Sequence, residues 1–225
     1  KGESFKDTVQ NIEAMKIDAV ILRHPASGAP LHLTKFVDAV VINAGDGTHE
    51  HPTQAILDMM SLQEQFNNLE GLKVGIIGDI SHSRVALSNI FGLTTMGADV
   101  MICGPSTLIP PHIEKLGVKV SYDMDEVIDW ADAVNILRIQ LERMGTGLYP
   151  SIREYRELFG LSVERIKRHS KDLVVMHPGP MNRGTEIDSA VADSDRAIIL
   201  DQVLNGVASR MAILYLLLSG KTEEN

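Results

Sequence analysis

The sequence predicts an α/β protein with two doubly wound parallel sheets, the first of them incomplete. Short apolar strands alternate with helical segments along most of the 225 residues. These strands are apolar throughout, which is typical of parallel strands that are covered on both faces. Several strands end in polar residues, and open parallel sheets bind ligands at the carboxyl ends of their strands.

The first elements are one helix and two strands. Ser4 is a suitable N-cap for a helix that carries Phe5, Val9 and Ile12 inward. Strands are expected at 19–22 and 39–42. A complete sheet needs further strands upstream, and the chain lacks an initiator Met, so we expect it to be the later part of a longer protein.

A helix that opens at Pro52 follows the second strand and a glycine-rich turn. Proline suits the first turn of a helix, where a missing N–H costs nothing. Spacing of i, i+3 and i+4 predicts that its inward residues are Ile56, Met59, Met60 and Phe66. His51 and Gln54 then lie at a helix N-terminus, which favours an anionic or polarised ligand. A structural cap with a surface histidine is the alternative.

The remaining elements alternate regularly. Strands are expected at 73–79, 99–103, 118–120, 133–137 and 173–176, and helices from about Arg84 and at 112–116, 125–130, 162–168 and 195–218. The last helix places Val203, Leu204, Val207, Met211, Leu214 and Leu218 on one stripe.

Composition narrows the class of function. The net charge of −9 argues against a nucleic-acid or anionic-membrane partner. The single Cys103 rules out an internal disulfide and fits a reducing compartment. There is no signal peptide and no run of 18 apolar residues. We therefore expect a cytoplasmic protein that binds neither nucleic acid nor membrane.

Three arginines follow three different strands of this acidic chain: Arg23, Arg84 and Arg138. Guanidinium groups match carboxylate and phosphate bidentately, so the sequence predicts a small polyanionic ligand. The alternatives are local: Arg23 pairs with an acid at the strand end, or Arg138 pairs with Glu142. His49 and His82 are expected at the surface.

Other ligand motifs are weak or absent. The eight histidines show no metal-ligand spacing, so no metal is expected. Gly75-x-x-Gly78 lacks the G-x-G-x-x-G pattern, which leaves a nucleotide-binding oxidoreductase as a minor alternative.

Six motifs together resemble the catalytic chain of the aspartate transcarbamoylase family, from Lys1 to about Leu218. They are Arg23-His24-Pro25, Asn43-Ala44-Gly45-Asp46-Gly47, His51-Pro52-Thr53-Gln54, Gly78-Asp79-Ile80-x-x-Ser83-Arg84, Leu137-Arg138-Ile139-Gln140-x-Glu142-Arg143 and His177-Pro178-Gly179-Pro180-x-Asn182-Arg183-Gly184. The resemblance implies the transcarbamoylase fold and the condensation of carbamoyl phosphate with L-aspartate, in pyrimidine biosynthesis, without a cofactor.

The resemblance also implies roles for individual residues. Arg23 and His51 look like the groups that polarise the carbamoyl carbonyl, and Arg23 also touches phosphate. Gln54 looks like the acceptor for the carbamoyl amide.

The substrate-binding set implied by the family is larger. Arg84, Arg138 and Gln140 look like the aspartate clamp, and the backbone at Pro178 and Gly179 closes on the carbamoyl group. Lys1 matches a mobile-loop lysine that reaches the neighbouring subunit's site. The family is thus expected to work as a homotrimer with shared active sites, with a regulatory chain or a dihydroorotase as further partners.

The family also contains ornithine enzymes, and this chain departs from the family pattern at one motif. Ornithine enzymes usually carry His-Cys-Leu-Pro where this chain has His177-Pro178-Gly179-Pro180, and Arg138 adds positive charge that favours aspartate. The family's Ser-Thr-x-Arg-Thr phosphate motif is absent, as are roughly the first 80 family residues. The chain as given is therefore expected to bind carbamoyl phosphate poorly, and a non-catalytic scaffold subunit stays open as an alternative.

The resemblance divides the chain into four parts. Residues 1–52 correspond to the remainder of a carbamoyl-phosphate domain and 53–67 to a connecting helix. Residues 68–202 correspond to the aspartate domain, and 203–220 to a helix that returns to the first domain and whose apolar stripe lacks a partner in this chain.

Overall fold

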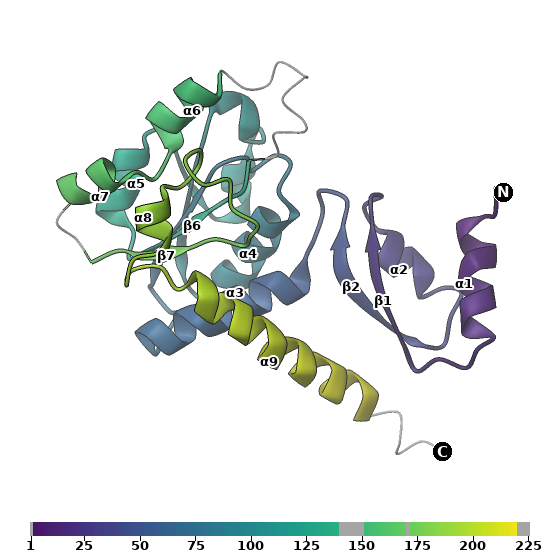
Figure 1. The fold of residues 1–225 in the computed structure, drawn as a ribbon. Helices are drawn as coiled ribbons and strands as arrows, with labels where there is room; N and C mark the ends of the chain where they lie inside the picture. Colours follow the sequence, from purple (N-terminus) through teal and green to yellow (C-terminus); the bar gives the residue numbers. More distant parts are fainter. Residues whose placement is uncertain (1, 140–150, 170–171, 220–225) are drawn as a thin grey trace.

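Two parallel sheets, joined by a long helix, form the framework of the protein (Figure 1). The computed structural model describes residues 2–139, 151–169 and 172–219. The smaller sheet pairs β1 (Ala19–His24) with β2 (Val40–Asp46), and α1 (Phe5–Glu13) and α2 (Ala29–Leu33) lie beside it. The predicted α/β class and the parallel pairing of its strands are confirmed.

The larger sheet has five parallel strands in the order β5-β4-β3-β6-β7. Their bounds are β3 Lys73–Ile77, β4 Asp99–Cys103, β5 Lys119–Ser121, β6 Ala133–Ile136 and β7 Val174–Met176. The chain runs outward from β3 to β5 and then returns to β6 on the other side of β3. The carboxyl ends of β3 and β6 therefore flank the topological switch point, where open sheets hold their ligands.

Side chains of this sheet alternate between two apolar clusters, one on each face. Ile76 and Ile102 pack with α4 (Arg84–Thr95) on one face. Ile77 and Cys103 pack on the other face with α5 (Met124–Trp130) and α6 (Ile152–Phe159). Because both faces are covered, the strands can be apolar throughout.

The joining helix α3 (Pro52–Phe66) begins where the sequence predicts, but its buried face differs. Ile56, predicted inward, is 40% exposed, and Met59, Met60 and Phe66 are only half-buried. The buried residues are Thr53, Gln54, Ala55, Leu57, Asp58, Ser61 and Leu62. The apolar period fails as a guide here because α3 buries polar side chains that bond to α4 and α9.

The C-terminal helix α9 (Ile199–Ser219) packs on α3 through polar side chains. Asn205 donates hydrogen bonds to Ser61 Oγ (3.0 Å) and Glu64 Oε2 (2.7 Å). The predicted apolar stripe is largely exposed, with Val203 64% and Met211 65% accessible, which agrees with the expectation that it lacks a partner in this chain. By length and composition alone α9 could cross a membrane, which is weak support for such a role.

In the described part of the chain, three helices are present that the sequence pattern does not predict: α2, α6 and α8 (Ser189–Ala192). The predicted helix at 162–168 is α7 (Val163–Arg168), capped by Ser162, whose Oγ accepts a bond from Arg165 N (3.1 Å). The segment predicted as a helix at 112–116 is a 3₁₀ turn at Ile113–Leu116. The domain boundaries at residues 52, 67 and 202 stay a prediction.

Candidate active site

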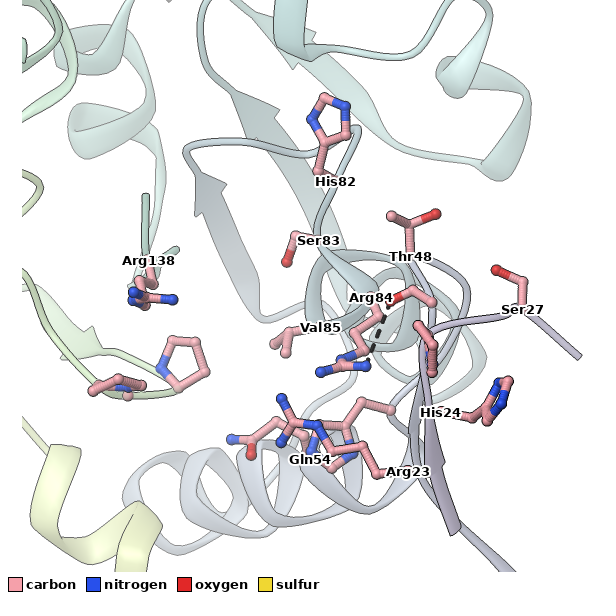
Figure 2. A pocket seen from close by; sticks show the side chains of 16 residues that line it. Arg23, His24, Ser27, Thr48, Gln54, His82, Ser83, Arg84, Val85 and Arg138 are labelled. Carbon is pink, nitrogen blue, oxygen red and sulfur yellow. Dashed lines mark hydrogen bonds between the residues drawn. The ribbon is translucent and has the colours of Figure 1, made fainter. Parts of the chain in front are cut away.

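A cavity of about 740 Å³ lies between the two sheets, at the carboxyl ends of β1, β3, β6 and β7 (Figure 2). It brings together seven of the nine site residues that the sequence predicts: Arg23, His51, Gln54, Arg84, Arg138, Pro178 and Gly179. Lys1 and Gln140 lie outside the described residues. The rest of the lining comes from His24, Pro25, Ser27, Gly47, Thr48, His82, Ser83, Val85 and Pro180.

A buried carboxylate fixes the loop that forms one wall of the cavity. Asp46, 1% exposed, ends β2 and accepts hydrogen bonds from Gly28 N (2.5 Å), Asn43 Nδ2 (3.0 Å) and Glu50 N (3.1 Å). Burial alone would raise the pKa of Asp46, but these bonds lower it below its usual value. Asp46 therefore stays ionised and holds the loops after β1 and β2 together.

His51 occupies the N-cap position of α3, but its side chain makes no capping hydrogen bond. The backbone N–H of His51 donates to Ser88 Oγ (2.8 Å), which anchors this helix end to α4. Its Nδ1 lies 3.4 Å from Thr53 Oγ1. When Nδ1 accepts a hydrogen bond from the Thr53 hydroxyl, the ring proton is on Nε2, and Nε2–H is the donor that the ring offers to the cavity.

The imidazole of His51 is neutral at physiological pH. Burial, and then the positive charges of three nearby arginines, lowers the pKa of His51 to about 4. These arginines are Arg84, Arg210 and Arg23. A neutral ring can donate one hydrogen bond to a polarised oxygen without adding charge to a site already rich in cations.

We expect an NMR titration to follow this low pKa. The folded state resists protonation of His51, so its Cε1–H resonance should move with a midpoint near pH 4. The unfolded chain takes up the proton first, near its ordinary pKa of about 6.5. This group therefore destabilises the fold as pH falls from about 6.5 towards 4. The resonance is assigned to His51 by its absence from the spectrum of the variant His51→Gln. A titration midpoint at pH 6 or above would contradict the argument that burial lowers this pKa.

Arg84 lies in the first turn of α4, whose N-cap Ser83 accepts a bond from Ala86 N (3.1 Å). A cation at a helix N-terminus is unfavourable by itself, because the helix dipole is positive there. A bound anion would therefore stabilise both the Arg84 guanidinium and the helix end. The guanidinium reaches across to the first wall, where Nη1 donates to Gly47 O (3.5 Å) (Figure 2). Gly45 makes room for it, because a Cβ at Gly45 would lie 2.9 Å from Arg84 Nε.

The variant Gly45→Ala is expected to displace the Arg84 guanidinium and lower kcat/KM about 10-fold or more. Gly45 also has φ +116°, so a side chain adds strain of about 1–3 kcal/mol. Gly117→Ala is the matched control, since Gly117 has φ +82° and open space around its Cβ. Steady-state kinetics and thermal unfolding of both variants check this. Equal kinetic losses in the two variants would mean that strain, and not Arg84, causes the effect.

His82, for which the sequence predicts a surface position, is partly buried and lines the cavity. Its Nδ1 lies 2.9 Å from Oδ1 of Asp79, which is buried two residues after β3. The sequence signal for this placement is an acidic residue just after a buried strand and three residues before the histidine. His49 is half exposed, as expected, and bonds to Asp46 (3.1 Å). The sequence gives no comparable signal for Ser27 and Thr48, which also line the cavity.

The opposite wall is the segment after β7, which contains a cis peptide between Gly179 and Pro180. His177 Nδ1 accepts a hydrogen bond from Gly179 N (2.9 Å), so Nε2 carries the proton and donates to Glu186 Oε1 (3.3 Å). Both His177 and Glu186 are buried. This pair shapes the loop that presents Pro178 and Gly179 to the cavity. Arg138 follows β6, which pairs directly with β7, the strand before this loop.

The cavity is suited to anions and not to a metal ion. Among residues 2–139, 151–169 and 172–219, no group of three His, Cys, Asp or Glu side chains gathers so as to hold a metal. The arginines of three elements, a neutral histidine and a glutamine amide can instead bind phosphate, carboxylate and carbonyl groups.

Comparison with known proteins assigns both parts of the chain. Residues 70–217 match the model of the aspartate/ornithine carbamoyltransferase Asp/Orn binding domain, and residues 1–64 match the carbamoyl-P binding domain of that family. The chain is 56% identical over 223 residues to the aspartate carbamoyltransferase catalytic subunit of Gemmatimonas aurantiaca, covering 99% of this chain and 70% of the relative. It is 58% identical to that of Heliobacterium modesticaldum, covering 98% and 70%.

Solved structures are similar as well. The catalytic subunit of M. Jannaschii aspartate transcarbamoylase gives a TM-score of 0.82 at 31% identity, covering 99% of this chain and 73% of that chain. Aspartate transcarbamoylase from Trypanosoma cruzi, in complex with carbamoyl phosphate, gives 0.83 at 26% identity, covering 95% and 70%. Ornithine carbamoyltransferase from Pyrococcus furiosus gives 0.83 at 25% identity, covering 98% and 72%.

Proposed function

The chain belongs to the aspartate/ornithine carbamoyltransferase family, and from this premise we propose that it transfers the carbamoyl group of carbamoyl phosphate to L-aspartate. The products are N-carbamoyl-L-aspartate and phosphate. The observation that carries the proposal is the cavity in which arginines from both sheets face a neutral histidine and a glutamine amide. The relatives from Gemmatimonas aurantiaca and Heliobacterium modesticaldum are both aspartate carbamoyltransferase catalytic subunits.

The chemistry requires positioning and charge more than proton transfer by the protein. The neutral α-amino group of aspartate attacks the carbamoyl carbon and forms the new N–C bond. Negative charge develops on the carbonyl oxygen, where His51 Nε2–H and the Arg23 guanidinium donate hydrogen bonds. The C–O bond to phosphate then breaks, and phosphate leaves with the electron pair and accepts the amine proton.

The remaining residues hold the two substrates, which repel each other as anions. Arg84 and Arg138 bind the carboxylates of aspartate, and Gln54 meets the carbamoyl amide together with the backbone at Pro178 and Gly179. Fixing the two reactants in one geometry converts a bimolecular step into an effectively unimolecular one. We expect no cofactor, because carbamoyl phosphate is already activated and phosphate is a good leaving group.

Aspartate is favoured over ornithine by the charge of the site. An ornithine enzyme must hold a cationic side chain, which three arginines would repel. The second carboxylate of aspartate instead gains a partner at Arg138.

The assembly and location follow as further proposals. We propose a cytoplasmic homotrimer with shared active sites, to which Lys1 contributes across the subunit interface, in pyrimidine biosynthesis. A regulatory chain or a dihydroorotase is the kind of partner that would join it.

The test is turnover by the complete gene product that contains this chain, with ¹⁴C-labelled carbamoyl phosphate and either amino acid. N-carbamoyl-aspartate and phosphate are expected in equal amounts, with kcat/KM for aspartate at least about 100-fold above that for ornithine. Citrulline as the main product, or no product with either amino acid, would overturn the proposal.

A further inference from the structure

A single buried carboxylate accepts hydrogen bonds from side-chain amides of four elements near the cavity. Asp58 on α3 is completely buried. Its Oδ1 accepts hydrogen bonds from Gln54 (3.0 Å) and Gln202 (2.7 Å). Its Oδ2 accepts from Asn89 (2.8 Å) and Asn135 (3.4 Å). None of these four partners is charged, so within the described part of the chain neutral amides compensate the buried anion.

The carboxylate determines how these amides are oriented. An ionised carboxylate only accepts hydrogen bonds, so each amide must turn its NH₂ group towards Asp58. For Asn89 and Asn135 this leaves the amide Oδ1 buried without a hydrogen-bond partner in the described part of the chain. An amide oxygen that is buried without a partner costs folding free energy. The hydrogen bond from the amide NH₂ to the Asp58 carboxylate must therefore contribute more than this cost. Burial raises the pKa of Asp58 to about 6, while the four amide bonds oppose that rise.

This orientation has a direct consequence at Gln54, which lines the cavity. Because its NH₂ group faces Asp58, its Oε1 is the polar atom that it offers to a ligand. The site therefore presents a hydrogen-bond acceptor at this point, which fits the amino group of a carbamoyl donor. A donor that carries a methyl group at the same position gains nothing from it.

The same carboxylate oxygen also supports the opposite wall. Gln202 donates to Asp58 Oδ1 through Nε2, and its Oε1 accepts a hydrogen bond from the backbone N–H of His177 (3.0 Å). His177 immediately precedes Pro178 and Gly179. One buried anion thus links Gln54 and the 177–180 segment, which the proposed function places on the carbamoyl group.

We propose that Asp58 is a positioning residue that selects carbamoyl over other acyl phosphates by holding the Gln54 amide with its oxygen towards the cavity. The proposal rests on the proposed function, since it assigns the origin of selectivity at that site. Asp58 does not touch the substrate and acts through Gln54.

The test compares carbamoyl phosphate with acetyl phosphate, in which a methyl group replaces the amino group. The readout is the ratio of kcat/KM for the two donors, with aspartate as the acceptor and the complete gene product as the enzyme. Asp58→Ala and Asp58→Leu are both measured, so that a folding defect in one leaves the other. Each is expected to lower the ratio about 10-fold, the scale of one hydrogen bond to a substrate. Gln54→Leu should lower it equally, and the double variant Asp58→Ala/Gln54→Leu no further.

Asn89→Ala is the matched control, because it removes an amide from the other oxygen of the same carboxylate. It should keep the donor ratio within about 2-fold of the wild-type value, whatever its melting temperature. A folded Asp58 variant that keeps the wild-type ratio would overturn the inference, as would an equal loss in Asn89→Ala. Failure of the proposed function is distinguishable, since the wild-type protein would then form no N-carbamoyl-aspartate.

Discussion

Replacing His51 with alanine is expected to lower kcat about 10²- to 10³-fold while changing the KM for aspartate by no more than about 3-fold. The loss corresponds to about 3–4 kcal/mol of stabilisation of the developing oxyanion, the scale of one preorganised donor in a site shielded from water. Substrate binding changes little because the donor acts mainly when charge builds up on the carbonyl oxygen. Steady-state kinetics with both substrates varied separate the two effects.

His32→Ala is the control for this prediction. His32 is an exposed histidine on α2 whose ring contacts Phe36 and does not line the cavity. Its kcat should equal that of the wild type. Unchanged turnover in His51→Ala would remove His51 from the mechanism, and a loss confined to the KM for aspartate would reassign it to substrate binding.

Replacing Arg138 with alanine is expected to raise the KM for aspartate about 10²-fold. Arg138 follows β6 at the switch point of the large sheet and lies half-buried across the cavity from Arg84 (Figure 2). A guanidinium that binds a carboxylate there contributes hydrogen bonds of about 1.5–3 kcal/mol each. The KM for carbamoyl phosphate should change less, because the second carboxylate belongs to aspartate alone.

Arg183→Ala provides the comparison. Arg183 follows the 177–180 segment but points to solvent, where it pairs with Asp193 (2.8 Å). Its removal deletes one positive charge near the site without touching the cavity, so the KM for aspartate should stay within about 2-fold. If both variants raise this KM equally, the net positive charge around the site attracts aspartate, and specific hydrogen bonds from Arg138 do not.

The sequence predicted the parts of the site that follow from strand ends and charge. Arg23, Arg84 and Arg138 could be placed on one edge because parallel strands end on the same side of a sheet. The strand order that brings Arg84 and Arg138 next to the switch point could not be predicted, since it depends on pairings between β3 and β6 that are distant in sequence.

The buried face of α3 shows why part of the architecture stayed hidden. An apolar period selects Ile56, Met59 and Met60, yet the polar Asp58 and Ser61 are among the residues that α3 buries. A buried polar residue is recognisable only when its partners are known, and those of Asp58 come from α4, β6 and α9. The apolar stripe of α9 is the reverse case, because its helical period follows from the sequence and its exposure agrees with the missing partner that the family resemblance implies.

A crystal structure of the complete gene product with N-(phosphonacetyl)-L-aspartate tests the account most directly. This compound, present in a solved complex of the Trypanosoma cruzi enzyme, joins features of both substrates in one molecule. We predict that it fills the cavity with its carboxylates on Arg84 and Arg138 and its carbonyl oxygen within hydrogen-bond distance of His51. Binding elsewhere, or in this cavity with the carboxylates away from both arginines, would contradict the assignment of the site.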